Sequence, residues 1–142
     1  MSDLSAHRTY VVVGSASFSG NKYKNAIKRD LRKKILGIDS VITGTVRGPE
    51  EWAVAVAREK HARVTVVPLG VDKLVSSGST LLSSKERQEL ALETVINRYE
   101  TMMKGATHMI AYWDGKSRGT EYAIALAKRL GIEVIEAQTS VL

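Results

Sequence analysis

The sequence has 142 residues, 44% of them hydrophobic and 25% charged, which is typical of an ordinary globular protein long enough to bury a proper core. Cysteine is absent, which excludes disulfides and thiolate metal sites. No run approaches the roughly 18 apolar residues of a membrane span, and the N-terminus lacks the apolar core of a signal peptide. We therefore expect a single domain over residues 1–142, without membrane association and in the cytoplasm.

Much of the formal net charge of +6 comes from one segment. The basic residues of this segment are Lys22, Lys24, Lys28, Arg29, Arg32, Lys33 and Lys34. A basic helix face can bind nucleic acid, or it can steer small anionic molecules toward a site. A solvated outer face is the simpler interpretation, and nucleic acid is kept as an alternative partner.

The first strand and helix are indicated by an apolar run and a four-residue repeat. Residues 9–13 form a continuous β-branched and apolar run, which fits a strand covered on both faces. A loop of small residues follows at 14–21. Apolar residues then recur at intervals of four, at Tyr23, Ile27, Leu31 and Ile35, which predicts one face of a helix that ends at Gly37.

The second strand is predicted over residues 38–43 and is followed by a second loop that contains glycine. Pro49 suits the first turn of the next helix, and Glu50 and Glu51 suit its positive end. That helix is predicted to run to about His61. A third strand is expected over residues 63–67, where Pro68 stops it.

Residues 70–80 are polar, rich in Ser and Gly, and without periodicity, as is typical of binding loops and lids. The sequence Ser83-Ser84-Lys85-Glu86 reads as a capping box that opens a long helix. The buried stripe of this helix is predicted to be Leu92, Val95 or Ile96, Tyr99, and Met102 or Met103.

The most informative stretch is residues 107–120. A short apolar run at 108–113 has the length of a buried strand, breaks into a polar loop with two glycines, and leads into a helix from about Thr120. A strand that ends in such a loop and leads into a helix is half of a nucleotide site. That helix is predicted to end at Gly131 and to be followed by a last strand at 132–135.

Five strands thus alternate with four helices. This pattern predicts an α/β fold, a Rossmann-like three-layer sandwich with a five-stranded, mainly parallel sheet and right-handed crossovers. Ligands of such sheets bind beyond the carboxyl ends of the strands, where the strand order reverses. The loops after the first, second and fourth strands contain the glycines, so their chemistry can converge on one crevice.

Residues of these loops could contact a phosphate or a nucleoside. Arg47 and Arg118 could clamp a phosphate with two hydrogen bonds, or they could instead form surface ion pairs. Asp114 could accept a hydrogen bond from a ribose hydroxyl or a base amine. The glycines could expose phosphate-binding N–H groups or could simply be required by turns. The corresponding backbone positions are Gly14-Ser15, Gly44-Thr45 and Gly119-Thr120, and the hydroxyl candidates are Thr43, Ser117 and Thr120.

The tryptophans and histidines add little to this interpretation. Trp113 lies at a strand end and could stack on a base or pack into the core, whereas Trp52 is expected in the core. The three histidines have no metal-ligand spacing, so no metal site is expected.

The loop from Trp113 to Thr120 closely resembles that of the SLOG superfamily (Smf/DprA–LOG), in particular its small stand-alone branch related to the YspA and YpsA proteins of bacteria and phages. Their Gly-Ser-Arg after the first strand resembles Gly14-Ser15, although Ala16 stands at the arginine position. Their Gly-x-Arg-Gly-x-Asp element resembles residues 44–50, with one more residue before the arginine and Glu for Asp. Their Arg-Asn-x-x-Met resembles residues 98–102, with Tyr in place of Asn.

This resemblance implies a Rossmann-like fold that binds a nucleotide-derived ligand, as a sensor or a sequestering protein. We expect no cofactor, and we expect a homo-oligomer. The expected ligand-binding residues are Gly14, Ser15, Thr43, Gly44, Arg47, Gly48, Arg98, Asp114, Gly115, Ser117, Arg118, Gly119 and Thr120.

Two alternatives stay open. Relatives called lonely-guy phosphoribohydrolases cleave N-glycosidic bonds with a Gly-Gly-x-Gly-Thr-x-x-Glu motif, but Ala123 stands where that Glu would be. A nucleoside or nucleotide N-glycosidase would therefore need another carboxylate, for which Glu50 and Asp114 are weak candidates. The start of a helix would favour the ionised form of Glu50. The other alternative is DNA binding of the DNA-processing type, which only the basic helix supports.

Overall fold

A computed structural model describes residues 7–68 and 84–137 of the chain, without the side chains of Ser84 and residues 87–92. The irregular segment predicted at 70–80 lies outside the described residues. The same is true of Ser83 in the predicted capping box and of the side chain of Leu92 in the predicted stripe. None of the described helices is both long and apolar enough to cross a membrane.

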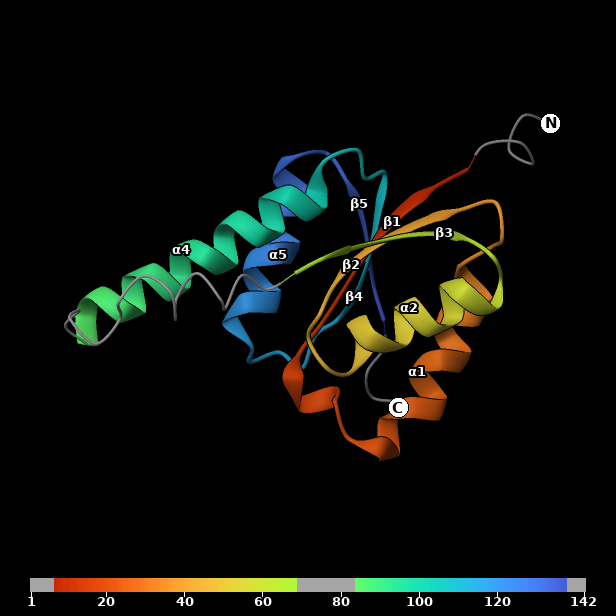
Figure 1. The fold of residues 1–142 in the computed structure, drawn as a ribbon, viewed down its shortest axis with the longest axis horizontal. Helices are drawn as coiled ribbons and strands as arrows, with labels where there is room; N and C mark the ends of the chain where they lie inside the picture. Colours follow the sequence, from red (N-terminus) through yellow and green to blue (C-terminus); the bar gives the residue numbers. More distant parts are fainter. Residues whose placement is uncertain (1–6, 69–83, 138–142) are drawn as a thin grey trace.

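The five strands form one sheet in the order β3-β2-β1-β4-β5, and every neighbouring pair is parallel (Figure 1). The predicted α/β fold with a parallel sheet and four flanking helices is therefore confirmed. The strands are β1 (Thr9–Gly14), β2 (Ser40–Gly44), β3 (Arg63–Val67), β4 (His108–Tyr112) and β5 (Glu133–Glu136). The helices are α1 (Asn21–Lys34), α2 (Pro49–Glu59), α4 (Ser84–Met103) and α5 (Arg118–Arg129), and a single 3-10 turn, η2 (Ala16–Phe18), follows β1.

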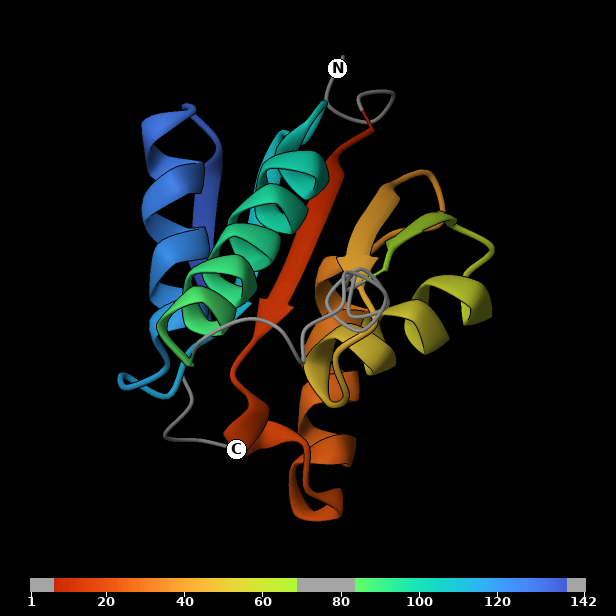
Figure 2. The same ribbon diagram turned by 60° about the vertical axis from the view of Figure 1, so that its left-hand side comes forward.

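The helices form two layers, one on each face of the sheet (Figure 2). Tyr10 and Val12 of β1 pack into the core beneath α1 and α2, whereas Val11 and Val13 pack into the core beneath α4 and α5. All four side chains are buried, because β1 is the central strand and successive side chains of a strand point to opposite faces. This is why residues 9–13 read as a continuous apolar run.

Most predicted element boundaries differ by one or two residues from the structure, for local reasons. Helix α2 ends at Glu59 because His61, with φ of 58°, turns the chain away from the helix. Helix α5 begins at Arg118, two residues before the predicted start, because the Ser117 side chain caps it by accepting the N–H of Thr120. The prediction of Trp52 in the core is confirmed, and both Met102 and Met103 are buried.

Candidate functional site

The strand order reverses between the central strand β1 and its neighbour β4. The chain leaves β1 toward α1 on one face and leaves β4 toward α5 on the other face (Figure 2). The loops that follow these two strands therefore diverge at their carboxyl ends, and this is where open α/β sheets bind ligands. The loop predicted to be most informative lies at this position.

Asp114 connects the two diverging loops. Its Oδ1 accepts the backbone N–H groups of Lys116 and Ser117, each at 2.8 Å. Its Oδ2 accepts the hydroxyl of Ser17 from the other loop at 2.7 Å. Its own N–H donates to the Ser15 hydroxyl at 3.2 Å.

These hydrogen bonds determine the charge of Asp114. The hydrogen bond from Ser17, followed by those from the two backbone N–H groups, lowers the pKa of Asp114 from 3.8 to about 2. The carboxyl group is therefore ionised at neutral pH, and it holds the loops together instead of donating a proton.

The amino end of helix α5 lies at the same junction of the two loops. Ser117 Oγ accepts the N–H of Thr120 at 3.4 Å, and Ser15 Oγ donates to the buried Thr120 Oγ1 at 3.3 Å. The N–H groups of Arg118 and Gly119 also belong to the first turn, where a helix offers no internal acceptor. The Arg118 side chain is exposed beside them. The amino end of α5 can therefore receive an anionic group.

Replacing Asp114 with asparagine is expected to lower the midpoint of thermal unfolding by ~2–4 °C at pH 7. This corresponds to about 1 kcal/mol for charge-assisted hydrogen bonds that solvent partly screens. Because the pKa of Asp114 is lowered in the fold, its contribution is present above pH 3.8 and is lost as the pH falls toward 2. Thermal unfolding from pH 7 down to pH 2 checks this. Glu121→Gln, in the first turn of α5, is the control, and a difference between wild type and Asp114→Asn that does not change with pH would refute the assignment.

The loop after β2 is held by a buried ion pair. Arg98 Nη1 lies 3.3 Å from Glu50 Oε1, and the two side chains are 4% and 1% exposed. Glu50 also accepts the N–H groups of Val46, at 3.4 Å, and of Gly44. A Cβ on Gly44 would lie 2.1 Å from Arg98 Nη1, so the pair passes directly against the glycine backbone. Arg98 Nε is buried without a hydrogen-bond partner among the described residues.

This geometry corrects the expectation that the surroundings of Glu50 favour its ionised form. Burial raises the pKa of Glu50 and outweighs the opposing effect of Arg98 and of the Val46 and Gly44 N–H groups. Glu50 and Arg98 lie beneath the loop and engage each other, which does not favour Glu50 as a catalytic carboxylate or Arg98 as a direct ligand contact.

Tyr99, the residue after Arg98, lies near the first turn of α5. A Cβ on Gly119 would lie 3.6 Å from the Tyr99 hydroxyl, an ordinary contact distance. The Arg98 guanidinium lies 4.6 Å from the centre of the Tyr99 ring. Two consecutive residues of α4 therefore support the loop after β2 and the amino end of α5.

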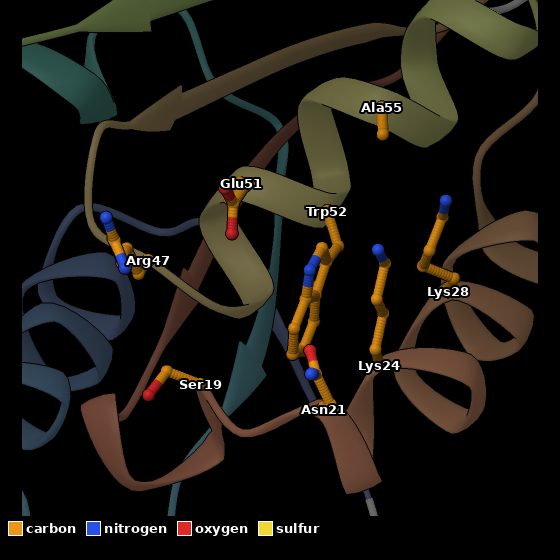
Figure 3. A pocket seen from close by; sticks show the side chains of 8 residues that line it. All are labelled: Ser19, Asn21, Lys24, Lys28, Arg47, Glu51, Trp52 and Ala55. Carbon is orange, nitrogen blue, oxygen red and sulfur yellow. The ribbon is translucent and has the colours of Figure 1, made fainter.

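The remaining predicted site residues are distributed around these loops. Thr43 is buried and donates to the Val12 carbonyl at 2.9 Å, so it links two strands within the sheet. Gly48 is the N-cap of α2, and Gly115 lies in an exposed turn. Arg47 is exposed and lines a cavity to which the loop after β4 contributes no residue (Figure 3). The prediction that Arg47 and Arg118 clamp one ligand stays a prediction.

Sequence reasoning missed Ser17 and the Tyr99 hydroxyl. Ser17 lies in the 3-10 turn after β1, a segment that looked like a plain loop of small residues. The alternation of Ser15, Ser17 and Ser19 is the one signal in the sequence that could have indicated a row of hydroxyl groups in the loop after β1. The helical periodicity predicts Tyr99 in a buried stripe, which is correct for its ring but says nothing about its hydroxyl.

No group of three His, Asp or Glu side chains that could hold a metal ion occurs within residues 7–68 and 84–137. Comparisons with protein-family models, with curated proteins and with solved structures found no match to this chain.

Proposed function

We propose that the chain binds a small nucleotide-derived ligand at the carboxyl ends of β1 and β4, as a sensor or a sequestering protein. The observation that carries this proposal is the hydrogen-bonded junction of the two loops at the point where the strand order reverses. There Asp114 fixes the loop before α5, and the first-turn N–H groups of α5 face outward without an internal acceptor. The resemblance of residues 113–120 to the SLOG loop supports the same ligand class.

In this proposal the residues at the junction of the two loops have different roles. The N–H groups of Arg118 and Gly119 and the guanidinium of Arg118 contact the anionic part of the ligand. Ser15, Asp114 and Thr120 hold the two loops in place through their mutual hydrogen bonds. Trp113 is half-buried, and its indole N–H donates to the Ser117 carbonyl at 3.0 Å, so the ring is anchored to the same loop.

Arg118→Ala is expected to weaken binding of a nucleotide by roughly tenfold or more, because a charge-assisted bidentate contact contributes about 1.5–3 kcal/mol. Thermal stability should change little, since the Arg118 side chain is exposed. Calorimetric titration with a panel of nucleoside monophosphates and NAD measures this. Mass spectrometry of small molecules that co-purify with the protein selects further members of the panel.

The matched control is Arg129→Ala, at the other end of the same helix, which is also exposed and should leave the affinity unchanged. Equal affinities of the wild type and Arg118→Ala for the nucleotide would show that Arg118 does not contact the phosphate. Absence of binding to every nucleotide in the panel and to every co-purified compound would refute the proposed function. Release of free base during incubation, followed by chromatography, would instead favour the N-glycosidase alternative.

A further inference from the structure

A cavity of about 420 Å³ lies between α1 and α2 (Figure 3). These two helices cover the face of the sheet opposite to α4 and α5. Small-molecule sites typically have volumes of about 300–1,000 Å³, so this cavity can hold a small metabolite. The eight residues that line it come from the loop before α1, from α1, from the loop after β2 and from α2. These are Ser19, Asn21, Lys24, Lys28, Arg47, Glu51, Trp52 and Ala55.

The charged residues of the lining are mostly cationic. Lys24, Lys28 and Arg47 contribute three positive charges, against the single carboxylate of Glu51. Among the described residues, no carboxylate forms an ion pair with Lys24 or Arg47. These charges are therefore available to an anion.

The positive charge of Lys28 is only weakly compensated by a neighbouring carboxylate. Its Nζ lies 3.9 Å from Glu59 Oε1, at the limit of an ion pair, and its side chain is 18% exposed. The Glu59 carboxylate is already bound by Arg32, which donates two hydrogen bonds at 2.9 and 3.0 Å. A ligand anion can therefore engage Lys28 without competing for a strong internal partner.

The two lysines are arranged for more than one anionic group. They lie one helical turn apart on α1, a rise of about 6 Å along the axis. In Figure 3 both extend from α1 toward the side of α2 that bears Trp52 and Ala55. Two linked phosphoryl groups carry more negative charge and more acceptor oxygens than one phosphate group, so they can engage both ammonium groups more strongly. Trp52 and Ala55 provide an apolar wall for the rest of such a ligand.

We propose that this cavity is a second ligand site, which binds a small molecule bearing a pyrophosphate group. Lys24 and Lys28 contact the pyrophosphate, and Arg47 adds positive potential from the loop after β2. The site is separate from the proposed nucleotide site at the amino end of α5, because neither Asp114 nor Arg118 lines the cavity.

The chain allows a direct spectroscopic test. Trp52 and Trp113 are its two tryptophans, so Trp113→Phe leaves Trp52, in the wall of the cavity, as the single reporter. We expect inorganic pyrophosphate to change the Trp52 emission saturably and to bind at least tenfold more tightly than inorganic phosphate. In this background Lys24→Met should weaken pyrophosphate binding by roughly tenfold, because one charge-assisted contact is lost.

Lys33→Met is the matched control, because Lys33 is an exposed lysine of the same helix that does not line the cavity. It should leave the affinity within twofold of the parent. Arg118→Ala should likewise leave the Trp52 titration unchanged, so failure of this site and failure of the proposed nucleotide site are distinguishable.

Three outcomes would overturn the proposal. The first is an absence of saturable change in Trp52 emission at millimolar pyrophosphate. The second is an equal loss of affinity in Lys24→Met and Lys33→Met, which would indicate that the anion is attracted by the general positive charge of α1 and not by a specific site. The third is binding of single-stranded DNA with a steep salt dependence but no binding of pyrophosphate, which would assign the basic helix to nucleic acid.

Discussion

Gly14→Ala is expected to lower the free energy of unfolding by about 3 kcal/mol, the upper end of the usual cost of overpacking. A Cβ on Gly14 would lie 2.4 Å from Cγ and 2.6 Å from Cβ of Pro49, the first residue of α2. The Pro49 ring is buried and rigid, so relief requires movement of the start of α2 away from the end of β1. Urea unfolding followed by circular dichroism measures the loss.

Gly119→Ala is the matched control for this substitution. Among the described residues, a Cβ there would meet only the Tyr99 hydroxyl, at 3.6 Å. Alanine is also a better helix former than glycine by about 1 kcal/mol. Its stability should be unchanged or slightly higher. The double variant Gly14→Ala with Pro49→Gly should be less destabilised than the sum of the two single variants, because Pro49→Gly removes the obstructing ring. Additive losses would show that the close approach of Gly14 to Pro49 is not the cause.

Arg98→Met is expected to destabilise the protein by roughly 3–5 kcal/mol at pH 7, the usual cost of removing one partner of a buried ion pair. Methionine keeps most of the length of the arginine stem but leaves the Glu50 carboxylate, 1% exposed, without its cation. Because Glu50 also holds the N–H groups of Val46 and Gly44, the loop after β2 should loosen at the same time.

The pH dependence of this variant identifies Glu50 as the cause. Burial already raises the pKa of Glu50 above its ordinary value of 4.5, and loss of Arg98 raises this pKa further. A carboxyl group with a raised pKa in the fold contributes most at low pH and loses that contribution as the pH increases. The Arg98→Met penalty should therefore be smallest near pH 4.5 and increase toward pH 7.

The control for Arg98→Met is the double variant Glu50→Gln with Arg98→Met. A neutral glutamine can still accept the loop N–H groups, so most of the stability should return and the pH dependence should disappear. Urea unfolding at several pH values measures both effects. A penalty in Arg98→Met that is independent of pH would show that lost packing, not an uncompensated carboxylate, is responsible.

The sequence alone determined the elements of this protein and the sheet class they form. The apolar run of residues 9–13, the four-residue spacing from Ile27 to Leu31, and the position of Pro49 at a helix start depend on backbone preferences and local periodicity. Such signals act between residues close in sequence, so they can be read without tertiary contacts. The alternation of strands and helices then leaves few topologies, because crossovers are right-handed.

Only the tertiary structure decided how the loops are held and which charged residues remain available. Asp114 meets Ser17 across 97 positions of the sequence, and Arg98 meets Glu50 across 48. Arg98 and Glu50 looked like site residues, but packing placed them beneath the loop after β2, where burial governs the pKa of Glu50. The physical reason is that periodicity shows which face of an element is buried but not which distant side chain packs against it. That pairing depends on the shape and packing of the whole core.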